Sequence, residues 1–370
     1  MQRQAIRAPR HASLNAVIRS VGPLNEVAQA SARRRLDTLT KPPGSLGRLE
    51  RLAIQIAGIT GCDLPRLEHR TIFVLAADHG VTSEGVSAYP QAVTAQMVRN
   101  FASGGAAINV LARLVRASVV VVDIGIAASL PPGDRRACDP GELVILHRKV
   151  AMGTRNLAVE PAMTDAQART AIQVGISLTD AALTPKPDAI CLGEMGIGNT
   201  TAASAIVAAL TGLPPAMVTG RGTGIDDATW VRKVSVIERA LALHKPDASK
   251  PLEVLTQLGG LEIAGLVGLV LGAAMRCIPI VVDGFIATAA ALIAVELCPA
   301  ARNYLVAAHR SVEVGHQAAL QRLELEPLFA LDLRLGEGTG AALALPLLDA
   351  ALALLADMAT FDEAGVAVHV

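Results

Sequence analysis

Short apolar runs that alternate with longer helical patterns constrain the fold of this chain more than any other feature of its sequence. Each run is rich in β-branched or other apolar residues, and a glycine or a polar residue separates it from the helical pattern that follows. The clearest runs are residues 71–76, 118–122, 189–192, 278–282 and 304–307, and a weaker one is 216–219. Repeated βαβ units have this sequence form. We therefore predict an α/β fold with a mostly parallel sheet that helices cover on both faces.

The helical patterns near the two ends of the chain have no strand partners. They cover residues 14–38 and 46–60, joined by the breaker Lys41-Pro42-Pro43-Gly44, and residues 339–358. We predict that they pack together as a small helical subdomain built from both termini, beside one large α/β domain. The expected bounds are 13–65 and 340–370 for the small subdomain and 66–339 for the large domain.

The start of the chain, residues 1–12, is rich in arginine and contains no acidic residue. No apolar segment of the kind found in secretion signals follows it, so we expect a loosely ordered extension rather than a targeting signal. The five cysteines are scattered, without a C-x-x-C pair or a histidine at ligand spacing. This pattern favours the reducing cytoplasm and argues against a structural zinc ion.

The charge balance of the chain excludes several classes of partner. Lysine plus arginine total 33 and aspartate plus glutamate also total 33, so no field that would attract nucleic acid or an anionic membrane is expected. Hydrophobic residues reach 52%, which calls for a test of membrane spans. The best candidate, 263–275, ends at Glu262 and Arg276, and the C-terminal apolar run is interrupted by Pro346 and Asp349. A spanning helix needs roughly 18–20 apolar residues, so we expect buried helices and small-molecule partners.

Charged residues and glycines collect where the predicted strands end. In open α/β sheets the carboxyl ends of the strands form the edge where ligands bind, because helix N-termini point into the crevice there. Strand-ending and helix-capping roles alone would account for some of these residues. The segments that follow five of the runs are Asp78-His79-Gly80, Asp123-Ile124-Gly125, Gly193-Glu194-Met195-Gly196, Asp283-Gly284 and His309-Arg310-Ser311.

The segment 193–201 joins a predicted strand to an alanine-rich helix. Its glycines let the backbone approach a ligand, and exposed N–H groups at the helix start suit a phosphate. It matches neither a Walker loop nor a dinucleotide fingerprint, and a plain tight turn is the alternative. Lys233, on a predicted helix, and Arg334 are candidates to neutralise a phosphate. A solvated surface position is the ordinary role of a single lysine or arginine.

Glu337 lies between two glycines just before a predicted helix, and a further glycine cluster spans 220–224. A substrate can reach such a carboxylate from both sides, and the positive end of the helix dipole would favour its ionised form. We interpret Glu337 as a base; the alternative is a carboxylate that merely complements the helix dipole. Three histidines lack a catalytic motif and are expected to form hydrogen bonds or cap helices: His79, His309 and His316.

Six long motifs occur together and in order along the chain. They are KPPGSLGRLE at 41–50, ADHGV at 77–81, SAYP at 87–90, GEMGIGNTT at 193–201, DGF at 283–285 and RLGEGTG at 334–340. With them the chain closely resembles the nicotinate-nucleotide:dimethylbenzimidazole phosphoribosyltransferases of cobalamin lower-ligand synthesis, from about residue 13 to about residue 360. The resemblance implies a Rossmann-like parallel sheet with a small helical domain from both termini, assembled as a homodimer whose partner helps to close the site.

The resemblance also implies roles for individual residues. Glu337 corresponds to the catalytic base and Glu194 to a second active-site carboxylate. The phosphate of the nucleotide is expected on one turn together with Lys233 and Arg334; the turn consists of Gly196, Ile197, Gly198, Asn199 and Thr200. Three residues fall in the region that lines the base pocket: Ser87, Tyr89 and Gln96.

The implied reaction moves the phosphoribosyl group of nicotinate mononucleotide to dimethylbenzimidazole and gives nicotinate and α-ribazole phosphate. Neither a cofactor nor a metal is expected. A pyrophosphate-dependent transferase would need paired acids after an apolar strand to organise Mg²⁺, and Asp226-Asp227 follow Thr223-Gly224 in the wrong order. Two alternatives stay open: a transferase whose acceptor is another azole, a purine or a phenol, and a non-catalytic nucleotide-binding protein on the same scaffold.

Overall fold

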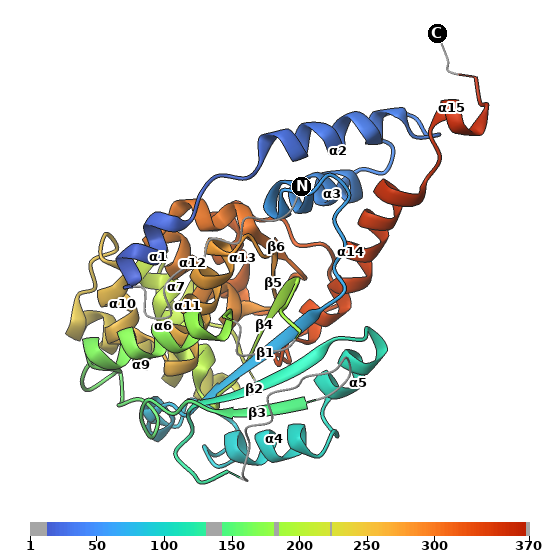
Figure 1. Cartoon of the computed structure of the whole chain (residues 1–370). Helices are drawn as coiled ribbons and strands as arrows, with labels where there is room; N and C mark the ends of the chain where they lie inside the picture. Colours follow the sequence, from blue (N-terminus) through green and yellow to red (C-terminus); the bar gives the residue numbers. More distant parts are fainter. Residues whose placement is uncertain (1–12, 131–142, 181–184, 223, 368–370) are drawn as a thin grey trace.

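The computed structural model describes residues 13–130, 143–180, 185–222 and 224–367 of the chain. The expected N-terminal extension, residues 1–12, lies outside the described residues. Helices pack on both faces of one sheet (Figure 1). Its six strands have the order β3-β2-β1-β4-β5-β6, and every pairing between neighbours is parallel. This is the strand order of the dinucleotide-binding folds, so the predicted Rossmann-like α/β class is confirmed.

The strands consist of apolar residues that are buried on both faces of the sheet. β2, for example, is buried along its whole length, as expected for a strand that helices cover from both sides. Five of the six strands match the predicted runs. The bounds are β1 Arg70–Ala77, β2 Ser118–Gly125, β3 Leu143–His147, β4 Ala189–Met195, β5 Ile280–Val282 and β6 Leu305–Ala307.

Two details of the strand prediction differ from the structure. The weaker candidate at 216–219 is wrong, because Pro215 begins a short helix, α8 (Pro215–Val218), and the fixed φ of proline suits a first helical position. Strand β3 was not predicted. Its apolar run is short, and it lies at the edge of the sheet, where it pairs with β2 alone.

Alternate residues of the central strands feed two separate hydrophobic cores. Phe73 and Leu75 belong to the core under α1, α6, α7 and α9–α13, whereas Ile72 and Val74 belong to the core under α2–α5 and α14. The helix bounds are α1 Leu14–Ser20, α2 Glu26–Thr38, α3 Arg48–Thr60, α4 Val93–Ala102, α5 Ala107–Leu114, α6 Asp165–Leu178, α7 Asn199–Thr211, α9 Asp227–His244, α10 Pro251–Leu258, α11 Leu261–Met275, α12 Phe285–Leu297, α13 Val314–Leu323, α14 Thr339–Asp357 and α15 Phe361–Ala364, with 3₁₀ turns η1 Gly80–Glu84 and η2 Pro299–Tyr304.

Helix α11 is the centre of the larger core, and every one of its residues is buried. It packs closely against α6, and glycine makes this approach possible. A side chain at Gly175 of α6 would collide with the carbonyl oxygen of Gly265, and one at Gly268 would collide with that of Ile172. The apolar segment 263–275 is therefore a core helix, as the sequence predicted.

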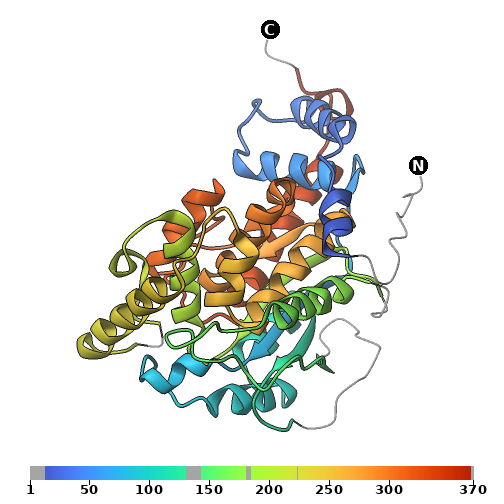
Figure 2. The same cartoon turned by 90° about the vertical axis from the view of Figure 1, so that its left-hand side faces the viewer.

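The helices from the two ends of the chain lie together at one end of the molecule (Figures 1 and 2). Arg35 of α2 donates from Nε to the carbonyl oxygen of Leu355 at 2.6 Å, which joins α2 to the end of α14. The predicted helical pattern 14–38 is divided at Gly22-Pro23 into two helices, α1 and α2. Helix α1 does not join the other terminal helices and instead packs against α6 and α11. The division into subdomains at 13–65, 66–339 and 340–370 stays a prediction.

Helix α14 is the one helix in the described ranges that is long and apolar enough to cross a membrane. Within its most apolar window, 56% of the residues are buried inside the protein. It packs against α3, α5 and β4. Its apolar face is therefore occupied by the protein's own core.

Candidate active site

The residues singled out in the sequence converge at the carboxyl edge of the sheet. Glu194 lies near the end of β4, Asp283 directly follows β5, and Glu337 precedes α14. Strand β4 lies between β1 and β5 in the sheet, so the segments that follow β1, β4 and β5 border one another. The expected ligand edge therefore carries three carboxyl groups beside the glycine-rich turn.

The turn between β4 and α7 is held from two sides. Gly198 has a φ of 93°, in the left-handed region, and is the N-cap residue of α7. A Cβ atom on Gly196 would lie 2.6 Å from the carbonyl oxygen of Ala77, so the turn rests directly on the end of β1. On the other side, the hydroxyl of Thr94 accepts the N–H of Ile197 at 3.1 Å. The turn predicted to bind phosphate thus has a fixed shape.

Glu194 is a buried carboxyl group that neighbouring anions surround. The side-chain amide of Asn199 donates to its Oε2 atom. Burial raises the pKa of Glu194 to about 8, and the charges of Asp283 and Glu262 act in the same direction, against the effect of the Asn199 hydrogen bond. The group is therefore mostly protonated at neutral pH, and a cation bound beside it would favour its ionised form.

Glu337 is held in an unusual backbone conformation. The φ angles of Gly336, Glu337 and Gly338 are 83°, 63° and 84°, so three successive residues are left-handed. For a residue with a side chain this costs on the order of 1–3 kcal/mol, and such strain is typical of functional sites. The N–H of Glu337 donates to the carbonyl oxygen of Glu194 at 3.2 Å, which fixes the loop to the end of β4.

The side chain of Glu337 is buried, and its Oε2 atom has no hydrogen-bond partner among the described residues. Burial raises the pKa of Glu337, and a hydrogen bond from the N–H of Ile108 opposes this shift. Burial thus acts against the ionised form that the dipole of the following helix was expected to favour, and the carboxyl turns toward the start of α5. A raised pKa suits a group that accepts a proton near neutral pH.

Asp283 supports the Glu337 loop, a role that the sequence did not predict, although Asp283 follows a predicted strand and begins the DGF motif. Its two carboxylate oxygens accept the N–H groups of Gly338 at 3.1 Å and Ala341 at 3.0 Å, so it caps the start of α14. Burial raises the pKa of Asp283 to about 7, against these backbone hydrogen bonds. In the sequence, its position at the end of a predicted strand was the feature that could have marked Asp283 as a residue of the site.

Lys233 is on α9, as predicted, but it is not on the solvated face of the helix. Its side chain is buried, and Nζ donates to the hydroxyl of Thr200 in the glycine-rich turn at 2.7 Å. Burial lowers the pKa of Lys233 to about 8, while the nearby charge of Glu313 acts in the opposite direction. The structure therefore brings Lys233 and Thr200 together, as an anion site requires.

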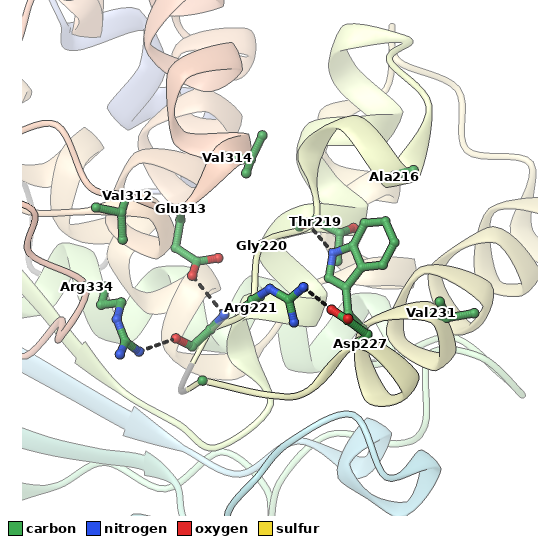
Figure 3. A pocket seen from close by; sticks show the side chains of 13 residues that line it. Ala216, Thr219, Gly220, Arg221, Asp227, Val231, Val312, Glu313, Val314 and Arg334 are labelled. Carbon is green, nitrogen blue, oxygen red and sulfur yellow. Dashed lines mark hydrogen bonds and ion pairs between the residues drawn. The ribbon is translucent and has the colours of Figure 1, made fainter.

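Arg334 lines a cleft of about 670 Å³ that Gly222 and Glu313 also line. Its Nη1 atom donates to the carbonyl oxygen of Gly222 at 3.0 Å, and the carboxylate of Glu313 accepts the N–H of the same glycine at 2.8 Å. Figure 3 shows the side chains of Arg334 and Glu313 pointing toward the loop that contains Arg221 and Gly222, here called the Gly222 loop. Glu313 was not predicted, because no motif in the sequence marks it.

Of the three residues expected around the base pocket, Ser87 and Tyr89 lie on the segment between η1 and α4, and Gln96 lies on α4. The hydroxyl of Ser87 accepts the N–H of Tyr89 at 3.2 Å, and the side chain of Tyr89 is 52% exposed. Gln96 is exposed on α4, two residues after Thr94, which holds the glycine-rich turn. This part of the chain is thus attached to the site; the side chains of Tyr89 and Gln96 are exposed to solvent, and Ser87 is half-buried.

Two of the three histidines near this edge, His79 and His316, make buried hydrogen bonds as expected, whereas Nδ1 of the buried His309 has no hydrogen-bond partner among the described residues and its Nε2 lies 3.8 Å from Asp283 Oδ1. His79 Nε2 lies 2.6 Å from Glu262 Oε1, and both side chains are fully buried. His316 accepts the N–H of Ser311 on Nδ1 at 2.9 Å, so Nε2 carries the proton and donates to Thr288 at 2.9 Å. Burial lowers the pKa of His316 to about 3, which keeps the ring neutral.

Comparison with known proteins agrees with this geometry. A family model described as phosphoribosyltransferase matches residues 21–366. Over 353 residues, the chain is 56% identical to the nicotinate-nucleotide:dimethylbenzimidazole phosphoribosyltransferase of a Roseiflexus species and 58% identical to the protein of the same name from Chloroflexus aggregans. Both alignments cover 95% of this chain and 98% of the relative.

A solved structure is also similar. The crystal structure of the nicotinate-nucleotide:dimethylbenzimidazole phosphoribosyltransferase from Thermus thermophilus matches with a TM-score of 0.85 at 46% sequence identity. The match covers 94% of this chain and 100% of the Thermus chain. Family model, relatives and solved fold agree over nearly the whole length: this chain belongs to the phosphoribosyltransferase family.

Proposed function

We propose that this chain transfers the phosphoribosyl group of nicotinate mononucleotide to dimethylbenzimidazole, in the assembly of the cobalamin nucleotide loop. The products are nicotinate and α-ribazole phosphate. The observation that carries the proposal is the pairing of Glu194 and Glu337, two buried carboxyl groups whose backbones are hydrogen-bonded at the ligand edge of the sheet. Relatives that are 56% and 58% identical bear the name of this activity.

The two carboxyl groups fit the chemistry of this transfer. The nicotinate ring is a pyridinium in the nucleotide, so it takes the electron pair of the breaking C1′–N bond and leaves neutral at that nitrogen. Positive charge develops on the ribose, and the ionised carboxylate of Glu194 stabilises it. One nitrogen of dimethylbenzimidazole attacks C1′ from the opposite face, which gives the α-linked product, while Glu337 accepts the proton from the other ring nitrogen.

The phosphate of the nucleotide is assigned to the junction of the glycine-rich turn and α9. Lys233 and the hydroxyl of Thr200 lie 2.7 Å apart there, and the turn continues through Gly196, Ile197, Gly198 and Asn199. Arg334 lies beside this junction, at the Gly222 loop. Ser87, Tyr89 and Gln96 are proposed to contact the acceptor base, because their segment is attached to the same turn through Thr94.

We further propose that the enzyme is a homodimer. Helix α5 supplies the N–H that faces Glu337, and its outer face exposes Val110 by 54% and Leu114 by 74%. A second copy on this face would bury both side chains and cover the site beside Glu337. Sedimentation of Leu114→Glu tests this: a shift from dimer to monomer together with lower activity is expected, and an unchanged dimer would contradict it.

A cytoplasmic location is also proposed. The cysteines that the structure describes all carry free thiols; Cys191 and Cys298 are buried, and Cys62 and Cys277 are exposed. Exposed free thiols persist in a reducing compartment. Fractionation of the source cells, followed by detection of the protein in the cytosolic fraction, checks this assignment.

One experiment tests the proposed reaction and separates it from its alternatives. The protein is incubated with nicotinate mononucleotide and a panel of acceptors that contains dimethylbenzimidazole, other azoles, a purine and a phenol, and the ribotides are identified by mass spectrometry. We expect α-ribazole phosphate as the main product. A preference for another acceptor would change the substrate, and nucleotide binding without any ribotide would favour the non-catalytic alternative. Glu337→Gln is the inactive control.

A further inference from the structure

Glu313 is an anionic side chain buried beside the proposed phosphate position. It lies between β6 and α13 and is only 6% exposed. As the N-cap residue of α13 it would ordinarily accept an N–H of its own helix, yet its side chain makes no such bond. Instead, Oε1 accepts the N–H of Gly222 at 2.8 Å. Its carboxylate therefore serves the Gly222 loop and not its own helix.

The donors around Gly222 are those that a phosphate would use. A Cβ atom placed on Gly222 would lie 3.1 Å from the hydroxyl oxygen of Thr200 and 3.5 Å from Nζ of Lys233. The carboxylate of Glu313 is close enough for its charge to favour the protonated form of Lys233. The N–H of Gly222, the hydroxyl of Thr200 and the ammonium group of Lys233 thus border one small volume, with Glu313 on one side of it.

The second oxygen of this carboxylate argues against a purely structural role. Glu313 Oε2 is buried and has no hydrogen-bond partner in the part of the chain that the structure describes. A side chain that only fixed a loop would gain by having both oxygens satisfied, because an unpaired buried polar atom is destabilising. The negative charge at this position therefore calls for a function that depends on charge.

We propose that Glu313 is an internal anion that competes with the substrate's phosphate for the Gly222 N–H and the Lys233 ammonium group, and so sets nucleotide affinity. The inference rests on the proposed function, which assigns the phosphate to Lys233 and Thr200. A dianion that enters this volume meets the charge of Glu313 and has to displace the carboxylate from Gly222. This displacement weakens the binding of phosphate esters and favours their release.

The substitution Glu313→Gln separates competition from loop positioning. Glutamine retains an oxygen that can accept the Gly222 N–H, so a residue that only positions the loop would leave ligand affinity unchanged or lower it. Removal of a competing charge would raise affinity, and only for ligands that carry a phosphate. Asp227→Asn is the matched control, because Asp227 lines the same cleft and pairs with Arg221 but is 86% exposed.

Calorimetry with three probes tests the proposal: nicotinate mononucleotide, its dephosphorylated riboside and inorganic phosphate. In Glu313→Gln we expect about tenfold tighter binding of the mononucleotide and of phosphate, unchanged binding of the riboside, and less than about a twofold change for any probe in Asp227→Asn. Unchanged or weaker binding of the phosphate-bearing probes to a folded Glu313→Gln protein overturns the proposal, and so does equal tightening of the riboside.

A crystal structure of the unaltered enzyme with nicotinate mononucleotide provides a test that does not depend on the variant. We expect the Gly222 N–H to donate to a phosphate oxygen and the Glu313 carboxylate to have turned away. A Glu313–Gly222 hydrogen bond that persists with the phosphate bound elsewhere overturns the inference. Failure of the proposed function would be different: the unaltered protein would not bind the mononucleotide at all, whatever residue 313 is.

Discussion

The N–H of Glu337 donates to the carbonyl oxygen of Glu194 across 3.2 Å, so the loop of one carboxyl group is fixed to the strand that carries the other. Both side chains share a desolvated region: burial raises the pKa of each, and the charge of Glu337 raises that of Glu194 further. A positively charged sugar between them would favour the ionised form of both. The acidity of the site therefore depends on the substrate that it holds.

Glu337→Gln is predicted to lower turnover at least a hundredfold. Glutamine keeps the shape of the side chain but cannot accept the azole proton, and loss of a general base usually costs about 10²–10⁴ in rate. A residue that only complemented a helix dipole would contribute about 0.3–1 kcal/mol of stability and little to the rate. Turnover is measured with chemistry rate-limiting. A folded variant that keeps more than about a tenth of the parental rate would assign the base elsewhere, with Glu194 next.

Lys233→Ala is predicted to weaken the binding of nicotinate mononucleotide by roughly ten- to a hundredfold, because one charge-assisted contact contributes about 1.5–3 kcal/mol. Calorimetry measures the affinity. Lys250→Ala is the matched control, since the Lys250 side chain is 55% exposed and forms a surface ion pair with Glu253. Equal affinities in the two variants would show that Lys233 does not contact the phosphate.

The pH dependence of kcat/KM is predicted to be bell-shaped with a narrow maximum near pH 8. Burial raises the pKa of Glu194 to about 8, so its ionised form increases as the pH rises; burial lowers the pKa of Lys233 to about 8, so its positive charge is lost over the same range. Lys233→Arg should move the alkaline limb upward, because a guanidinium stays charged. A profile with the alkaline limb unmoved in that variant would contradict this assignment.

Glu194→Gln is predicted to flatten the dependence of stability on pH. The folded pKa of Glu194 is about 8 and its ordinary value is 4.5, so the folded state binds more protons between these values and stability falls as the pH rises. One such group contributes a slope of up to about 1.4 kcal/mol per pH unit. Urea unfolding at pH 5.5 and pH 7 measures the slope. Parallel curves for parent and variant would mean that Glu194 is ionised in the folded protein.

Turnover is predicted to need no divalent metal ion. The leaving nicotinate is activated by the positive charge of its own ring, so no cation is required to stabilise negative charge on the leaving group. Activity measured after dialysis against a chelator should stay within about twofold of the untreated enzyme. Loss of activity that returns only when Mg²⁺ is added back would contradict the prediction.

The fold and the site differ in how far the sequence alone predicts them. The buried strand at 118–125 is marked by a run of valines, and Glu337 by the glycines on either side of it. In contrast, the burial of Lys233 and the contact of Glu313 with Gly222 join segments that are far apart in the chain. No local pattern records such long-range contacts, and a single carboxylate or lysine looks the same in sequence whether it is solvated or buried.

The left-handed backbone at 336–338 also has a consequence for engineering new acceptor specificities. A side chain at Gly336 would collide with Glu194, and one at Gly338 would lie 2.7 Å from a methyl group of Ile72, so a mutant library at these two positions would yield few folded members. The surface segment with Tyr89 and Gln96 is under no such restriction. Diversity there, with 336–338 left untouched, is the efficient design for directed evolution of this scaffold.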